Sequence, residues 1–215
     1  MIPIGDDDTS VRLTPIVNYL LIALNVIVFL LELSGGNAFI EKWAFVPARF
    51  LDNPSAEFPT LFTSMFMHAG WMHLAGNMLY LWIFGDNVED RFGHGKYIIF
   101  YMLCGLGALF AQLAFSADSN IPNVGASGAI SGVLGAYLIL SPQGRIRVFM
   151  GRGVVYAPAI VVIGIWILIQ VFSGIGSLEN MGEKGGVAYM AHIGGFVAGL
   201  ILTFLFRGSG VRATA

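Results

Sequence analysis

Six long apolar runs follow one another along the chain, separated by shorter polar or glycine-rich segments. They cover residues 16–33, 71–84, 97–115, 127–140, 155–172 and 187–206. A helix needs roughly 20 apolar residues to cross a bilayer, whereas a spanning strand needs only about 10. Because backbone groups in lipid must bond to one another, runs of this length are predicted to be helices. The pattern therefore predicts an all-α, polytopic membrane protein with six transmembrane helices.

The composition supports this interpretation of the runs. Hydrophobic residues make up 56% of the chain and charged residues 11%, against roughly 25% charged residues in soluble domains. The net charge of -2 leaves no basic stripe, so nucleic acid is excluded as a partner and membrane lipid is expected. Cys104 stands alone, which excludes an intrachain disulfide and a paired-cysteine metal site. We expect one membrane domain over residues 1–215, with a short segment at 1–14 and a tail at 207–215.

Lysine and arginine are distributed unevenly between the segments that join the runs. With six spans and the N-terminus inside, the cytoplasmic set is Arg12, Arg91, Lys96, Arg145, Arg147, Arg152, Arg207 and Arg212, and the outer set is Lys42, Arg49 and Lys184. An excess of positive residues marks the cytoplasmic side of a membrane protein. Both termini are therefore predicted to be cytoplasmic, in the plasma (inner) membrane of a prokaryote.

The second, fourth and sixth predicted spans carry polar residues that could serve a common site, and such residues are expensive to bury in lipid. His73 and Asn77 lie four residues apart, so both project from one face of the second span. Ser127 opens the fourth span and His192 lies within the sixth. Each residue alone has an ordinary explanation, because imidazole and amide groups join helices by hydrogen bonds and a serine caps a helix start.

Glycines accompany the serine and the histidine on their helices. They are Gly128, Gly132 and Gly135 on the fourth span and Gly195 and Gly199 on the sixth. Small residues let helices approach closely in lipid. We therefore predict that these faces pack together and bring His192 within reach of Ser127, as a base and a nucleophile require. Such a nucleophile also needs donors for the developing oxyanion, and His73 and Asn77 fall at the same depth.

Four motifs at these positions resemble those of the rhomboid intramembrane serine proteases. They are Gly125-Ala-Ser127-Gly128 for GxSG, Ala191-His192-Ile-Gly194 for AHxxG, His68, His73 and Asn77 for HxxxxHxxxN, and Glu89-Asp-Arg91-Phe-Gly93 for ExRxG. The motifs occur in the family's order, and the resemblance covers residues 15–206. It implies a six-helix rhomboid-like bundle that hydrolyses peptide bonds in or near transmembrane segments of other membrane proteins.

The resemblance also implies a role for each motif residue. Ser127 and His192 would form a dyad without a carboxylate, and His192 would act as base and then as acid. Asn77, His73 and the backbone N–H of Ser127 would hold the oxyanion. The supporting residues would be His68, Gly125 and Gly128. No cofactor and no metal are implied.

Two positions depart from the family pattern. Many bacterial members carry a tyrosine four residues after the serine, packed against the catalytic imidazole, whereas this chain has Ser131. The family often shows a Trp-Arg pair in its first loop, where this chain has only the arginine, Arg49. Between the last two spans, residues 174–186 hold five glycines, and we interpret this segment as a mobile cap over the site.

Two other classes of function remain open from the residues alone. A transporter or channel could line an ion or proton path with His68, His73, Asn77 and His192. It would need no nucleophile-like serine at a helix start, and no internal repeat of the kind common in transporters is visible. A zinc protease ranks third, since the chain has no HExxH motif.

Overall fold

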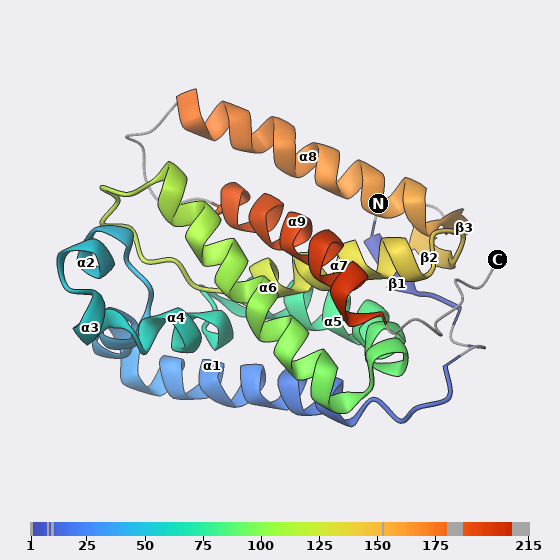
Figure 1. Ribbon diagram of the computed structural model, residues 1–215, viewed down its shortest axis with the longest axis horizontal. Helices are drawn as coiled ribbons and strands as arrows, with labels where there is room; N and C mark the ends of the chain where they lie inside the picture. The colour runs from blue at the N-terminus through green and yellow to red at the C-terminus, as the bar shows by residue number, and fades with distance from the viewer. Residues whose placement is uncertain (1, 8, 10, 152, 180–186, 208–215) are drawn as a thin grey trace.

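The computed structural model describes residues 2–7, 9, 11–151, 153–179 and 187–207. Its long helices are α1 (Ile16–Trp43), α5 (Trp71–Phe92), α6 (His94–Phe115), α7 (Ser127–Leu140), α8 (Ala159–Glu179) and α9 (Tyr189–Phe206). Between α1 and α5 lie the short helices α2 (Pro47–Asp52), α3 (Pro54–Glu57), α4 (Thr60–Thr63) and η1 (Ser64–Phe66). Three strands are β1 (Ile2–Gly5), β2 (Arg145–Phe149) and β3 (Val154–Pro158). A long helix therefore lies over each of the six apolar runs (Figure 1).

Four helices in the described part of the chain are long and apolar enough to cross a membrane. They are α1, α6, α9 and the Ala159–Gly176 part of α8, and α7 is a shorter apolar helix. Helix α5 has sufficient length but ends in a charged segment that includes Asp86, Glu89 and Arg91. The chain is thus a mostly helical, multi-pass membrane protein, and the crossing of the membrane by all six helices stays a prediction.

The all-α prediction is wrong in one respect, because the strands form an antiparallel sheet in the order β1-β2-β3. On β2, Arg145 and Arg147 are exposed while Ile146 and Val148 are fully buried, a period-two pattern typical of a half-buried strand. The predicted fifth span starts at residue 155, but β3 runs to Pro158 and α8 begins at Ala159. The β-branched and aromatic residues of β3 are as common in a sheet as in a helix that faces lipid. The sequence pattern therefore did not distinguish this strand from the start of a transmembrane helix.

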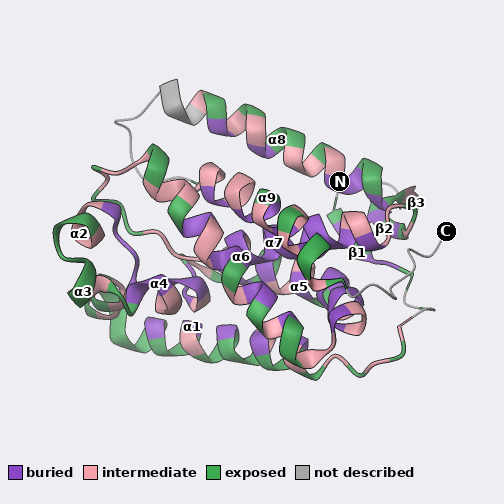
Figure 2. Ribbon diagram, in the orientation of Figure 1, coloured by how far each residue is buried: buried purple, intermediate pink, exposed green. Residues whose placement is uncertain are grey.

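Helix α7 lies at the centre of the molecule and is buried along most of its length (Figure 2). It packs most extensively against α9 through the predicted glycine faces. A Cβ atom built at Gly199 would lie 2.7 Å from the carbonyl carbon of Gly132, and one at Gly135 would lie 2.7 Å from the carbonyl oxygen of Phe196. Real Cβ atoms do not come this close, so only glycine fits. The prediction that these two faces pack together is confirmed.

A buried carboxylate joins α5 to the start of α1. Glu89 is fully buried and accepts hydrogen bonds from the backbone N–H groups of Val17 (2.9 Å) and Asn18 (2.7 Å). These donors belong to the first turn of α1, where no intrahelical acceptor exists and where the helix dipole favours a negative charge. The side chain of Asn18 donates to the carbonyl of Leu81 (2.9 Å) and accepts from the hydroxyl of Tyr97 (2.9 Å). Helices α1, α5 and α6 are thus fastened together at one end.

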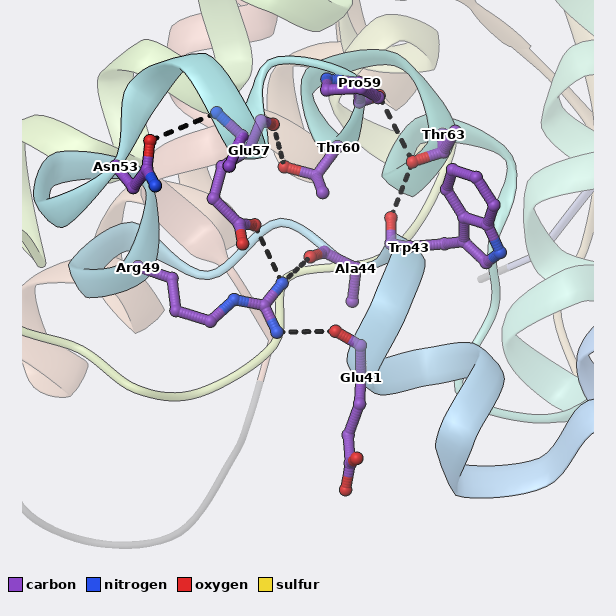
Figure 3. Close-up of polar contacts among 10 residues, drawn as sticks. Glu41, Trp43, Ala44, Arg49, Asn53, Glu57, Pro59, Thr60 and Thr63 are labelled. Atoms are coloured by element: carbon purple, nitrogen blue, oxygen red, sulfur yellow. Dashed lines mark hydrogen bonds and ion pairs between the residues drawn. The ribbon is translucent and has the colours of Figure 1, made fainter.

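At the other end, Arg49 organises the segment that joins α1 to α5 (Figure 3). Its guanidinium donates to the carbonyl oxygens of Glu41 (2.5 Å) and Ala44 (3.0 Å) and to the carboxylate of Glu57 (2.9 Å). Arginine suits this arrangement because its planar group offers several donors in fixed directions. Arg49 therefore ties the end of α1 to α3 without an adjacent tryptophan.

Candidate active site

Ser127 and His192 meet where the starts of α7 and α9 lie side by side. The Oγ atom of Ser127 lies 2.7 Å from the Nε2 atom of His192, although the residues are 65 positions apart. Ser127 is the first residue of α7, so its backbone N–H belongs to the donors at the positive helix end. The close glycine packing of α7 and α9 brings the two backbones near enough for this hydrogen bond.

The segment before Ser127 is fixed by backbone hydrogen bonds. Asn123 N–H donates to the carbonyl of Phe45 (2.7 Å), and Gly125 N–H donates to the carbonyl of Ser64 (2.9 Å). Gly125 adopts φ +135°, a conformation that other residues rarely adopt. A Cβ there would also lie 2.9 Å from the Nε2 atom of His73 and 3.5 Å from the Oγ atom of Ser127. Gly125 therefore keeps open the space between this serine and this histidine.

His73 directs a hydrogen-bond donor, its Nε2 atom, to the space beside Gly125. Its Nδ1 atom accepts a long hydrogen bond from the backbone N–H of Ala69 (3.4 Å). A neutral imidazole that accepts at Nδ1 carries its proton at Nε2, and Nε2 is the atom beside Gly125. Asn77, one turn further along the same face of α5, is buried, and its Nδ2 atom has no hydrogen-bond partner among the described residues.

His68 packs against His73. It is buried, its ring meets the ring of His73 edge to face at 5.1 Å, and its backbone N–H donates to the carboxylate of Glu32 (2.9 Å). Gly128, on the α9 side of α7, packs against Ala108 of α6. Gly128 also lines the cavity that adjoins Ser127, and the supporting roles of His68 and Gly128 stay predictions.

The hydroxyl of Ser131 hydrogen-bonds within α7. Its hydroxyl is fully buried and donates to the carbonyl oxygen of Ser127, 2.6 Å away and one turn earlier in α7. Where many relatives place a tyrosine, this chain therefore has a hydroxyl that bonds its own helix. The contacts to the Nδ1 atom and the ring face of His192 come from α8.

Two residues of α8 make these contacts, and neither is predicted from the sequence. The Oε1 atom of Gln170 lies 2.7 Å from the Nδ1 atom of His192. The ring of Trp166, one turn earlier, faces the imidazole with a centroid distance of 5.9 Å and an interplanar angle of 35°. Gln170 could have been identified from the sequence, since it is a lone amide in the apolar run 155–172. Polar residues within membrane spans usually have a function.

A small cavity adjoins Ser127. It has a volume of about 30 Å³, and its lining includes Ser64, Asn123, Gly125 and Ala188. A water molecule requires roughly 10–15 Å³ and two or more polar partners. The cavity therefore has the room and the polar groups to hold a water molecule beside the hydroxyl.

The prediction of a mobile cap over residues 174–186 is wrong for its first part. Helix α8 continues through Gly174 and Gly176 to Glu179, because glycines within an apolar helix weaken it without ending it. Residues 180–186 lie outside the described residues. In the described part of the chain, no group of three or more His, Cys, Asp or Glu residues could hold a metal ion, and the absence of a metal stays a prediction.

The chain is similar in sequence to several known proteins. Residues 55–209 match the family model described as Rhomboid domain. The chain is 34% identical over 194 residues to rhomboid protease GluP of Bacillus subtilis (strain 168), an alignment that covers 87% of this chain and 35% of the relative. It is 30% identical over 189 residues to the mitochondrial rhomboid protein 1 of Saccharomyces cerevisiae, covering 85% and 51%. RHOMBOID-like protein 4 of Arabidopsis thaliana is 32% identical over 145 residues, covering 67% and 33%. The chain thus spans a third to a half of the length of these relatives.

Proposed function

Because this chain belongs to the rhomboid family, we propose that it is an intramembrane serine endopeptidase whose catalytic groups are Ser127 and His192. The hydrogen bond of 2.7 Å between Oγ and Nε2 carries the proposal. It has the length that proton transfer from a nucleophile to a general base requires. The names of relatives such as rhomboid protease GluP agree with this chemistry.

The reaction follows from the positions of these two groups. The Ser127 oxygen attacks the carbonyl carbon of a peptide bond while Nε2 of His192 takes the hydroxyl proton. The imidazolium then gives this proton to the leaving nitrogen, the C–N bond breaks and an ester to Ser127 remains. Water attacks the ester while His192 takes a proton from the water. The C–O bond to Ser127 then breaks, the imidazolium returns this proton to the serine oxygen, and a new carboxylic acid is released. The cavity of about 30 Å³ beside Ser127 suits the attacking water.

The developing oxyanion would be held by three donors. The backbone N–H of Ser127 lies at the start of α7, Nε2 of His73 faces the space beside Gly125, and Nδ2 of Asn77 is a buried amide donor. Such donors act strongly where water is excluded and where they are already oriented. His68, Gly125 and Gly128 would support this arrangement by packing.

The substrate would be a transmembrane segment of another membrane protein, reached from the lipid. Peptide bonds within a helix are shielded by hydrogen bonds, so helix-weakening glycine or proline near the cleaved bond should favour hydrolysis. We further propose six spans with both termini cytoplasmic, in the inner membrane of a prokaryote, because lysine and arginine favour that side.

Labelling by a fluorophosphonate probe tests the proposal directly. The purified chain in detergent should be labelled, and the Ser127→Ala variant should not. Equal labelling of the two proteins would rule out Ser127 as the nucleophile. Activity should survive a chelator; loss on chelation with recovery on zinc would favour the metalloprotease alternative instead.

A further inference from the structure

Gln170 is an unusual residue for its position in the chain. It is buried in α8 and surrounded along the helix by apolar residues such as Ile169 and Val171. An amide buried in a membrane helix is destabilising unless it is hydrogen-bonded. Its main partner is the imidazole of His192, at 2.7 Å. The cost of placing an amide here is therefore offset mainly by contact with one side chain of the proposed dyad.

The two ends of the Gln170 amide have different partners. Its Nε2 atom donates to the carbonyl oxygen of Trp166 (3.4 Å) in the same helix, and its Oε1 atom faces the Nδ1 atom of His192. A carbonyl oxygen only accepts hydrogen bonds. With the amide in this orientation, the Nδ1 atom of His192 is the donor and carries a proton.

This tautomer leaves the opposite nitrogen ready to act as a base. With the proton on Nδ1, the Nε2 atom of a neutral imidazole has a lone pair, and that atom lies 2.7 Å from the Oγ atom of Ser127. In the other tautomer, Nε2 would donate to the serine oxygen and could not take its proton. The hydrogen bond to Gln170 thus selects the form of His192 that the reaction needs.

Helix α8 also restricts the orientation of the imidazole ring. Trp166 covers it at a centroid distance of 5.9 Å, while Gln170 fixes its Nδ1 corner. When the imidazolium forms during the reaction, the same Oε1 atom can continue to accept the Nδ1 proton. A neutral amide does this without a buried carboxylate, whose removal from water would be far more costly.

We propose that Gln170 is a positioning residue that holds His192 in its Nδ1-protonated tautomer and in line with Ser127, an inference that rests on the proposed function of this dyad. Gln170 does not touch the substrate; it acts through His192. The arrangement gives the site a third member that is an uncharged amide on a neighbouring helix.

Two substitutions separate positioning from packing. Gln170→Met keeps the length of the side chain and removes the acceptor, whereas Gln170→Glu keeps an acceptor at the same position. We expect Gln170→Met to lower kcat about 10- to 100-fold on a transmembrane substrate with KM little changed, as expected for a misoriented base. Gln170→Glu should restore most of the lost rate. Ile169→Met, at the adjacent exposed position, is the matched control and should keep the wild-type kcat.

The tautomer can be measured without any catalysis. The chain has four histidines, so nitrogen-15 NMR of histidine-labelled protein, assigned with a His192→Ala variant, reports the protonated nitrogen of His192. We expect protonated Nδ1 in the wild type and a mixture of tautomers in Gln170→Met. Protonated Nε2 in the wild type would overturn the proposal, as would a Gln170→Met variant with unchanged kcat. If instead the tautomer is as expected but Ser127 is not labelled by fluorophosphonate, the proposed function fails while the positioning of His192 stands.

Discussion

Gly199 of α9 packs directly on the backbone of Gly132 in α7, so that a Cβ on Gly199 would lie 2.7 Å from the Gly132 carbonyl carbon. The contact lies two turns along α9 from His192, and it leaves no space for a side chain. Because α7 carries Ser127 and α9 carries His192, the distance between these helices also sets the distance between the two proposed catalytic atoms.

Gly199→Val should therefore reduce activity far more than expression. The two added methyl groups and the Cβ must push α9 from α7, with an overpacking cost of about 1 to 3 kcal/mol. A displacement of about 1 Å can lower a rate on the order of 10²-fold. Cleavage of a transmembrane substrate in proteoliposomes provides the measurement. Val197→Leu, at an exposed position of the same helix, should be nearly silent, and full cleavage by Gly199→Val would show that this contact does not control the dyad.

Asn77→Ala should lower turnover about 10²- to 10³-fold, as the loss of one oxyanion donor typically does. The Nδ2 atom of Asn77 has no partner among the described residues, so its removal should leave the thermal midpoint of unfolding nearly unchanged. Comparison of kcat with thermal unfolding in the same detergent separates the two effects. Unchanged turnover, or a large loss of stability, would assign Asn77 to helix packing instead.

Gly125→Ala should also impair catalysis. The added Cβ meets the ring of His73 at 2.8 Å, and φ +135° is strained for alanine, so the ring or the loop must shift. We expect kcat to fall at least 10-fold, because displacement by a fraction of an ångström disturbs an oriented site. Gly153→Ala, where a Cβ would meet nothing within 4 Å, provides the control. Equal kcat for the two variants would contradict a role for the space beside Gly125.

Glu89→Ala should destabilise the fold while leaving the site chemically intact. The substitution leaves the N–H groups of Val17 and Asn18 without their acceptor, at about 1 to 3 kcal/mol for each buried donor. Unfolding in mixed micelles should show a loss of roughly 2 to 6 kcal/mol in the free energy of unfolding, and fluorophosphonate labelling at low temperature should persist. Glu41→Ala, which removes an exposed carboxylate, should change little. A stability equal to wild type would mean that water satisfies these donors.

The sequence was sufficient to predict the helices and the glycine contact, because both follow from local patterns. Long apolar runs indicate helices in lipid, and the spacing of Gly195 and Gly199 indicates a helix face without side chains. The sequence was insufficient to predict the contact of Gln170 with His192. A lone amide does not indicate which helix it contacts, and its partner lies 22 residues away. The same limit applies to β1, whose partner strand lies more than 140 residues further along the chain. These two pairings, of Gln170 with His192 and of β1 with β2, depend on packing that no local pattern encodes.

The carboxylate of Glu89 has a consequence for how the protein is made. The acceptor of the Asn18 N–H is Glu89, which is 71 residues further along the chain. At about 5–20 residues per second, a ribosome needs roughly 4 to 14 seconds to add that stretch. Until Glu89 has been added, the N–H groups of Val17 and Asn18 lack the acceptor that they have in the folded chain. Helix α1 is therefore expected to reach its final packing only after α5 has been synthesised.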